Sequence, residues 1–283
     1  MLFTGAGKLL QTLYIFPWDA FLALYNLVTP NKKVGTIVPK GCPGAGGTWP
    51  AFVAPKEGDS RSACPALNAM ANHGIRKATS CPLNFPSDGR NIKFTDMTTT
   101  IRTTFNFAPT FCLFVPTFMA QLLKKNYKTD TCDLADISMH NGIEHDASLT
   151  RQDFKYDPDQ GKPYLPFIEE LLASATGKDK DGNPLLTAAD LSRYSGKRRT
   201  EARATNPDFT LDTFHKMFGS SNSSTLLTIF GGKIADLEPL LMEERLPEGW
   251  ESRVRSRMGL TFLAFNRTVL SVERAIKEGD APM

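Results

Sequence analysis

Residues 63–74 read Ala63-Cys64-Pro65-Ala66-Leu67-Asn68-Ala69-Met70-Ala71-Asn72-His73-Gly74 and form the most informative stretch of the chain. Proline is favoured at the first position of a helix, because its missing N–H would have no partner there. Glycine suits the residue after the last turn, where a left-handed backbone costs it little. The pattern therefore predicts a short helix that begins at Pro65 and is closed by Gly74, with Cys64 at or beside its N-cap.

Cys64 is the residue of this stretch that carries chemistry. At the N-cap its sulfur faces free backbone N–H groups and the positive end of the helix dipole. Such surroundings lower the pKa of a thiol and favour the thiolate, which binds metals. Three interpretations are open: a buried structural cysteine, one half of a disulfide, and a thiolate ligand. Ala66, Ala69 and Ala71 leave little bulk on the helix, so a flat, wide group would fit against it, which favours the third interpretation.

A second motif, Glu144-His145-Asp146-Ala147-Ser148, lies well downstream. Its acidic oxygens and hydroxyl are hard ligands of the kind that Mg²⁺ and Ca²⁺ prefer. The alternative interpretation is a solvated acidic turn in which Ser148 is the N-cap of a helix.

The two motifs, in this order, resemble those of the fungal heme-thiolate peroxidases, the chloroperoxidase and unspecific peroxygenase family. In that family a Pro-Cys-Pro helix start supplies the axial cysteine to heme iron. Here Ala63 replaces the first proline, and His145 indicates the short, histidine-containing branch. The resemblance implies a mainly α, single-domain chloroperoxidase-like fold with long loops, in which Cys64 is the axial iron ligand of heme b.

The resemblance also implies a divalent cation, usually Mg²⁺, beside a heme propionate. Its ligands would be the Glu144 carboxylate, the Ser148 hydroxyl and the His145 carbonyl, with Asp146 as a weaker candidate. Three like charges, from two carboxylates and a propionate, would repel one another unless a cation neutralised them.

A distal glutamate, oriented by the histidine of the second motif, moves a proton during peroxide cleavage in the resembled family. The His145 side chain would therefore point into the distal pocket. Glu201 is the best candidate for the catalytic glutamate, and the pair Glu169-Glu170 supplies the alternatives. The competing interpretation of Glu201 is a surface ion pair with Lys197 and Arg198, which lie four and three residues earlier.

The activity implied by the resemblance is that of an oxidoreductase, a peroxidase or peroxygenase. It would use H₂O₂ to oxidise or oxygenate small organic substrates through a ferryl heme intermediate, and a thiolate ligand favours O–O cleavage. The enzyme would be either a broad secreted oxidant or a dedicated step in fungal secondary metabolism. The alternative from another class is a membrane-tethered helical interaction domain with a structural Cys64 and no heme.

Composition excludes some other functions. The formal net charge of +3 over 283 residues is too small to indicate nucleic-acid binding, and no basic run is interleaved with aromatic residues. The five cysteines contain no C-x-x-C pair, which argues against a zinc site. Their odd number leaves at least one thiol unpaired, and nothing in the sequence selects a disulfide among the cysteines other than Cys64.

Three regions are predicted: an apolar N-terminal extension (1–33), a Gly/Pro-rich arm (34–62) and the peroxidase domain (63–283). Residues 9–28 are apolar except for interruptions such as Asp19 and Asn26. They are interpreted as an uncleaved membrane anchor, a signal segment or an amphipathic helix packed on the domain. The first two would give a membrane-associated protein or one in the secretory pathway. Within the domain the apolar spacing is mostly helical, and residues 250–276 carry the longest such pattern.

Overall fold

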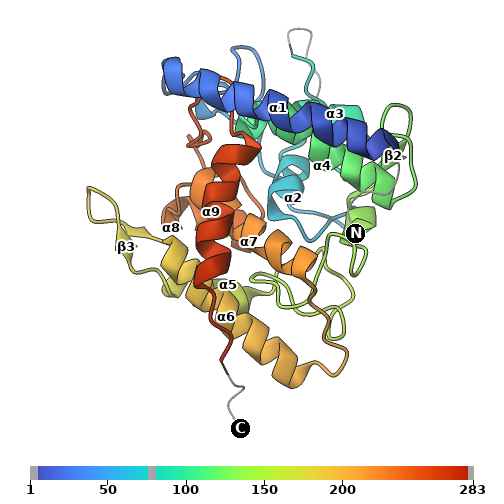
Figure 1. Ribbon diagram of the computed structural model, residues 1–283, viewed down its shortest axis with the longest axis vertical. Coiled ribbons are helices and arrows are strands. Elements are labelled where there is room, and N and C mark those ends of the chain that lie inside the picture. Colours follow the sequence, from blue (N-terminus) through green and yellow to red (C-terminus); the bar gives the residue numbers. More distant parts are fainter. Residues whose placement is uncertain (1–5, 76–80, 280–283) are drawn as a thin grey trace.

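The computed structural model of the protein describes residues 6–75 and 81–279. Within them the fold is mainly α, with long loops, as predicted (Figure 1). The helices are α1 (Ala6–Val28), α2 (Pro65–Asn72), α3 (Phe94–Phe105), α4 (Pro109–Leu122), α5 (Leu165–Ala173), α6 (Ala188–Thr205), α7 (Thr213–Thr228), α8 (Ile234–Met242) and α9 (Phe262–Ala275). Two short antiparallel pairs complete the regular structure, β1 (Ile92–Lys93) with β2 (Thr131–Cys132) and β3 (Gly177–Lys178) with β4 (Pro184–Leu185).

Helix α2 begins and ends where the sequence predicts. Pro65 occupies its first position, and the backbone of the N-cap residue Cys64 is extended. The carbonyl of Cys64 accepts the first helical hydrogen bond, from the N–H of Asn68 at 3.1 Å. Gly74 follows the helix with a φ of +55°, a conformation that a residue with a side chain adopts at a cost.

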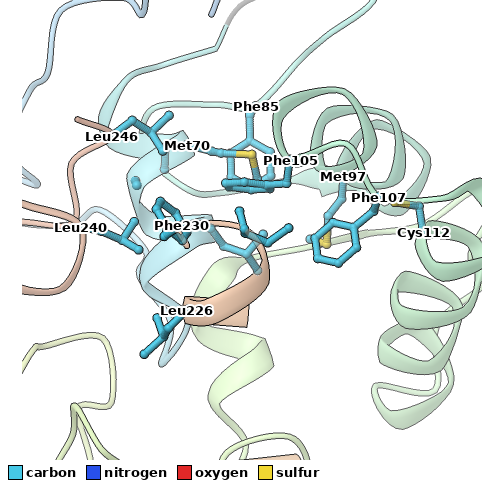
Figure 2. Close-up of a cluster of buried hydrophobic side chains, with 14 of the residues drawn as sticks. Met70, Phe85, Met97, Phe105, Phe107, Cys112, Leu226, Phe230, Leu240 and Leu246 are labelled. Carbon is cyan, nitrogen blue, oxygen red and sulfur yellow. The ribbon is translucent and has the colours of Figure 1, made fainter. Parts of the chain in front are cut away.

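The hydrophobic core is built from buried side chains of every helix from α2 to α9, and Figure 2 shows part of it. Side chains far apart in the sequence pack there, such as Met70 of α2 with Phe105 of α3 and Phe230 after α7. Helix α9 packs along α7 and α6. The core therefore holds α2, with Cys64 at its N-terminus, against helices from the whole length of the chain.

The long helical pattern predicted over residues 250–276 is only partly correct. The helix in this region, α9, begins at Phe262, after Thr261, whose hydroxyl accepts a hydrogen bond from the N–H of Ala264 at 3.3 Å. Gly259 lies just before it with a φ of +84°, and a Cβ there would lie 2.6 Å from the Asn106 carbonyl oxygen. This turn, which approaches the backbone at Asn106 closely, interrupts the helix predicted over residues 250–276. Val254, one of the apolar residues of that pattern, is buried but lies outside any helix.

The Gly/Pro-rich arm is tied to the domain by a disulfide between Cys42 and Cys81, whose Cα atoms are 5.1 Å apart. The Trp49 indole also donates a hydrogen bond to the Trp250 carbonyl at 2.9 Å. The arm is therefore anchored to the domain at Cys42 and at Trp49. The division of the chain into three regions stays a prediction.

Helix α1 lies along one edge of the molecule, at the top of Figure 1, and packs on α4 and α9. Ile15 and Leu22 are buried in this contact. The amphipathic-helix interpretation of the N-terminal extension matches this packing. Within the described part of the chain, no helix has the length and apolar character needed to cross a membrane.

Candidate functional site

Cys64 is a free thiol, which excludes the disulfide interpretation. The backbone N–H groups of Leu67 and Ala66 approach its sulfur, as expected at a helix N-terminus. Burial nevertheless raises the pKa of the Cys64 thiol above its ordinary value, because desolvation outweighs these two N–H groups. The predicted net lowering of this pKa is therefore wrong. Metal binding removes the proton from a ligating thiol, so the N–H groups would then stabilise the thiolate.

The other two free cysteines differ from Cys64. Cys112 and Cys132 are buried, whereas Cys64 keeps partial exposure. Burial raises the pKa of Cys132 to about 12 and raises that of Cys112 as well. Cys112 is the fourth residue of α4 and Cys132 lies in β2, so neither is the N-cap of a helix. Of the three free thiols, Cys64 is the one that combines backbone donors with access.

A buried ion pair lies beside Cys64. The Arg151 guanidinium donates to the Glu244 carboxylate, and both charges act on the Cys64 thiol. Asn68 of α2 donates to the same Glu244 oxygen at 2.8 Å. Because Arg151 follows Ser148 by only three residues, this network connects the chain just after the second motif to the helix that carries Cys64.

The second motif is buried, so its interpretation as a solvated turn is wrong. Glu144 accepts a hydrogen bond from His140 Nδ1 at 2.7 Å, and Asp146 accepts one from the N–H of Thr210 at 2.9 Å. Burial raises the pKa of both carboxyl groups. The backbone turns at Ala147, which has a φ of +60° and donates its N–H to Asp153 at 2.9 Å.

The structure does not support the predicted magnesium site. Glu144 Oε1 and Asp146 Oδ1 are buried without a hydrogen-bond partner. However, residues 6–75 and 81–279 contain no group of three or more His, Cys, Asp or Glu side chains that could hold a metal ion. The Ser148 hydroxyl instead accepts a hydrogen bond from the N–H of Thr150 at 3.3 Å.

His145 is buried with a defined orientation. Its Nδ1 lies 2.7 Å from the Asp146 carbonyl, which can only accept, so Nδ1 carries the proton. Burial lowers the pKa of His145 to about 4, so the ring is neutral at pH 7. Gly219 of α7 makes room for it, because a Cβ on Gly219 would lie 3.1 Å from Cε1 and 3.3 Å from Nε2 of His145.

His215 lies beside His145 and was not singled out by the sequence. The two ring centroids are 6.1 Å apart. His215 Nδ1 lies 2.9 Å from Asp212, whose carboxylate also accepts the His215 N–H as the N-cap of α7. Its Nε2 is buried with no hydrogen-bond partner among the described residues. The one sequence signal for His215 as a site residue is its position three residues after Asp212. The same spacing is found at an ordinary helix N-terminus, where the aspartate is the N-cap.

Glu201 forms the ion pairs of its competing interpretation. Its carboxylate lies 2.8 Å from Lys197 Nζ and 2.9 Å from Arg198 Nη1, on α6. Partial burial raises the pKa of Glu201, but the hydrogen bonds from these two cations lower it overall. Glu170, one of the alternatives, is exposed and pairs with Lys197. The catalytic role of Glu201 therefore stays a prediction.

The chemical groups at Cys64 are compatible with binding of a heme iron. A free thiol that faces two backbone N–H groups is suited to bind a metal as the thiolate. The alanines do not form the predicted open face, because Ala69 and Ala71 have no exposed surface and pack in the core. A cavity of about 740 Å³ lies along the outer side of α8, and Cys64 does not line it.

Comparison with known families defines the class of the protein. A peroxidase family matches residues 50–255, which include Cys64 and the Glu144–Ser148 motif. The chain belongs to this family, described as Peroxidase, family 2, the fungal chloroperoxidase family. It is therefore an oxidoreductase of the H₂O₂-dependent peroxidase class. The family suggests heme as the cofactor and implies a small substrate besides H₂O₂, and it does not favour a heme-free interaction domain. No curated protein matches the chain.

Proposed function

We propose that this protein is a heme-thiolate peroxidase in which Cys64 binds the iron of heme b. One observation carries the proposal: Cys64 is a free thiol at the N-cap of α2, with the N–H groups of Ala66 and Leu67 beside its sulfur. Membership of the peroxidase family supports it. The Arg151 charge beside the thiol favours the thiolate, and the Glu244 charge opposes it.

When bound, the heme supplies peroxide cleavage and oxidation of the substrate, and a thiolate ligand favours the cleavage step. The chain contributes thiolate stabilisation at α2 and proton transfer. A group that takes a proton from H₂O₂ must be unprotonated at working pH. His145 meets this requirement, because its pKa is about 4 and its Nδ1–H is held by the Asp146 carbonyl.

His215 is the second residue that we include in proton transfer. Its Nε2 is buried and unpaired within the described chain, while the Asp212 carboxylate holds its Nδ1. A carboxylate that orients an imidazole in this way leaves Nε2 available to exchange a proton. The two adjacent imidazoles would do the work that the sequence assigned to Glu201.

Absorbance spectroscopy of the purified protein, produced with ample heme, tests the ligand. We expect a heme Soret band and the red-shifted ferrous–CO band of a thiolate complex. Cys64→Ala should abolish the red-shifted band, whereas the matched variant Cys112→Ala should keep it. A colourless wild-type protein, or an unchanged band in Cys64→Ala, would overturn the proposal.

Two narrower proposals are that the enzyme inserts oxygen into its substrate, as a peroxygenase does, and that it catalyses a step of fungal secondary metabolism. Both derive from the sequence resemblance. Oxidation of apolar substrates with ¹⁸O-labelled H₂O₂ tests the first: a peroxygenase transfers the label into the product, whereas one-electron peroxidase turnover does not.

A further inference from the structure

Two polar side chains of helix α1, those of Asp19 and Asn26, point inward. Asp19 is 2% exposed, and its carboxylate accepts hydrogen bonds from the N–H groups of Phe262 and Leu263 at 3.1 and 3.0 Å. It thus satisfies free N–H groups at the start of α9. Asp19 also accepts a hydrogen bond from the Thr110 hydroxyl of α4. One buried carboxylate therefore joins three helices.

Asn26 forms a second polar contact two turns later. Its side chain donates to the Gly259 carbonyl at 3.0 Å and accepts from the N–H of Met258 at 2.8 Å. Ile15 and Leu22 are buried on the same side. Positions 15, 19, 22 and 26 follow the helical period, so they form one stripe. This stripe fixes which face of α1 points away from the protein.

The opposite face of α1 is apolar and exposed. Between residues 14 and 28 the one charged side chain is Asp19, which points inward. Leu27, Val28 and Phe21 are 79%, 75% and 62% exposed. The exposed apolar face consists of Tyr14, Phe16, Phe21, Leu24, Tyr25, Leu27 and Val28. Exposed apolar patches of this kind mark sites of protein or membrane interaction.

Basic side chains gather where this face ends. The Lys32 N–H donates to the Arg255 carbonyl at 2.7 Å, and the Arg255 guanidinium donates to the Lys32 carbonyl at 3.2 Å. Burial lowers the pKa of Lys32, and so do the nearby charges of Arg102 and Arg257. Glu251 is the acidic group that acts on Lys32, so the basic charges outnumber it. Exposed Lys33 adds to the cluster.

We propose that α1 lies flat in the surface of a lipid bilayer with anionic headgroups. The exposed apolar face would enter the boundary between headgroups and acyl chains, and the exposed side chains of Lys33, Arg255 and Arg257 would contact the headgroups. This combination of an apolar helix face and neighbouring basic residues is typical of interfacial helices. Tyrosine suits the headgroup level, and phenylalanine and leucine are typical of the buried face of such helices. The position of α1 along an edge of the molecule (Figure 1) leaves the helix accessible to a flat surface.

Vesicle flotation of the full-length chain tests the proposal. We expect binding to phosphatidylcholine vesicles that contain about 30% phosphatidylserine, and weaker binding to pure phosphatidylcholine or at high salt. The triple variant Phe21→Glu, Leu24→Glu, Leu27→Glu should bind the anionic vesicles about tenfold more weakly or worse, because charges replace the apolar face. Lys33→Glu with Arg257→Glu should reduce the preference for the anionic lipid.

The matched control is Val53→Glu, which replaces a 65% exposed apolar residue outside α1 and should bind like the wild type. Thermal unfolding checks that the triple variant is folded. Equal binding by the triple variant and the wild type would overturn the proposal. Absence of binding to the anionic vesicles would also overturn the proposal. This includes the outcome in which sedimentation shows a dimer, with the apolar face buried between two copies of the chain.

Discussion

The guanidinium of Arg151 and the carboxylate of Glu244 form an ion pair beside the Cys64 thiol, with side chains only 1% and 4% exposed. Arg151 lies just after the Glu144–Ser148 motif, and Glu244 lies just after α8. The pair therefore holds together two distant parts of the chain at the N-terminus of α2. Both charges are out of water, so each depends on the other for its stabilisation.

Arg151→Met should destabilise the protein strongly, because it leaves the Glu244 charge buried without its partner. The expected loss in the free energy of unfolding is about 3–5 kcal/mol, measured by urea denaturation. Lys155→Met is the matched control, because Lys155 and Asp208 form an exposed pair; its stability should be close to that of the wild type. Equal stability of the two variants would show that the pair contributes nothing.

His215→Gln should lower peroxidase turnover by roughly 10²-fold or more while heme stays bound, because general acid–base groups contribute on that scale. Steady-state kinetics should show the effect mainly in kcat, with an unchanged ferrous–CO spectrum. Glu201→Gln decides between the two assignments. A large loss of kcat in that variant, with a normal rate in His215→Gln, would return the role to the carboxylate.

Gly219→Ala should slow turnover without unfolding the protein. The added Cβ would lie 3.1 Å from His145 Cε1, so the ring must move. Alanine is intrinsically more favourable than glycine inside a helix by about 1 kcal/mol, which offsets part of the strain. Ser221→Ala on the same helix is the control. Wild-type rates in Gly219→Ala would show that the position of the His145 ring is unimportant.

Acidification should destabilise the protein through His145. The folded-state pKa of about 4 lies below the ordinary value of 6.5, so the unfolded chain takes up a proton first as the pH falls. The contribution of neutral His145 to the free energy of unfolding is complete above pH 6.5. Between about pH 6.5 and pH 4 the free energy of unfolding falls by at most about 3 kcal/mol. His145→Gln should therefore show a flatter stability profile over this range. Parallel profiles for variant and wild type would contradict the assignment.

Reduction of the Cys42–Cys81 disulfide should lower the free energy of unfolding by about 3–4 kcal/mol, since its partners are 39 residues apart in sequence. Thiol titration of the unreduced, denatured protein should count three free cysteines, and five after reduction. A count of five before reduction would mean that the arm is not covalently tied.

Several features of the protein could be predicted from the sequence because local interactions determine them. Pro65 and Gly74 mark the ends of α2 by backbone preferences that act within one turn, and they place Cys64 at the N-cap. The helical spacing of apolar residues predicts the mainly α class in the same way. The two motifs were also sufficient to indicate the peroxidase family.

Contacts between distant residues were decided by the tertiary structure alone. The pairing of Cys42 with Cys81, the ion pair of Arg151 with Glu244, and the position of His215 beside His145 depend on how the helices pack, which no local preference encodes. Burial reversed the direction expected for the pKa of Cys64, because desolvation depends on every element that surrounds the thiol. The apolar composition of α1 was visible in the sequence. Which face of the helix is exposed was decided by Asp19 and Asn26, through their contacts with backbone more than 200 residues away.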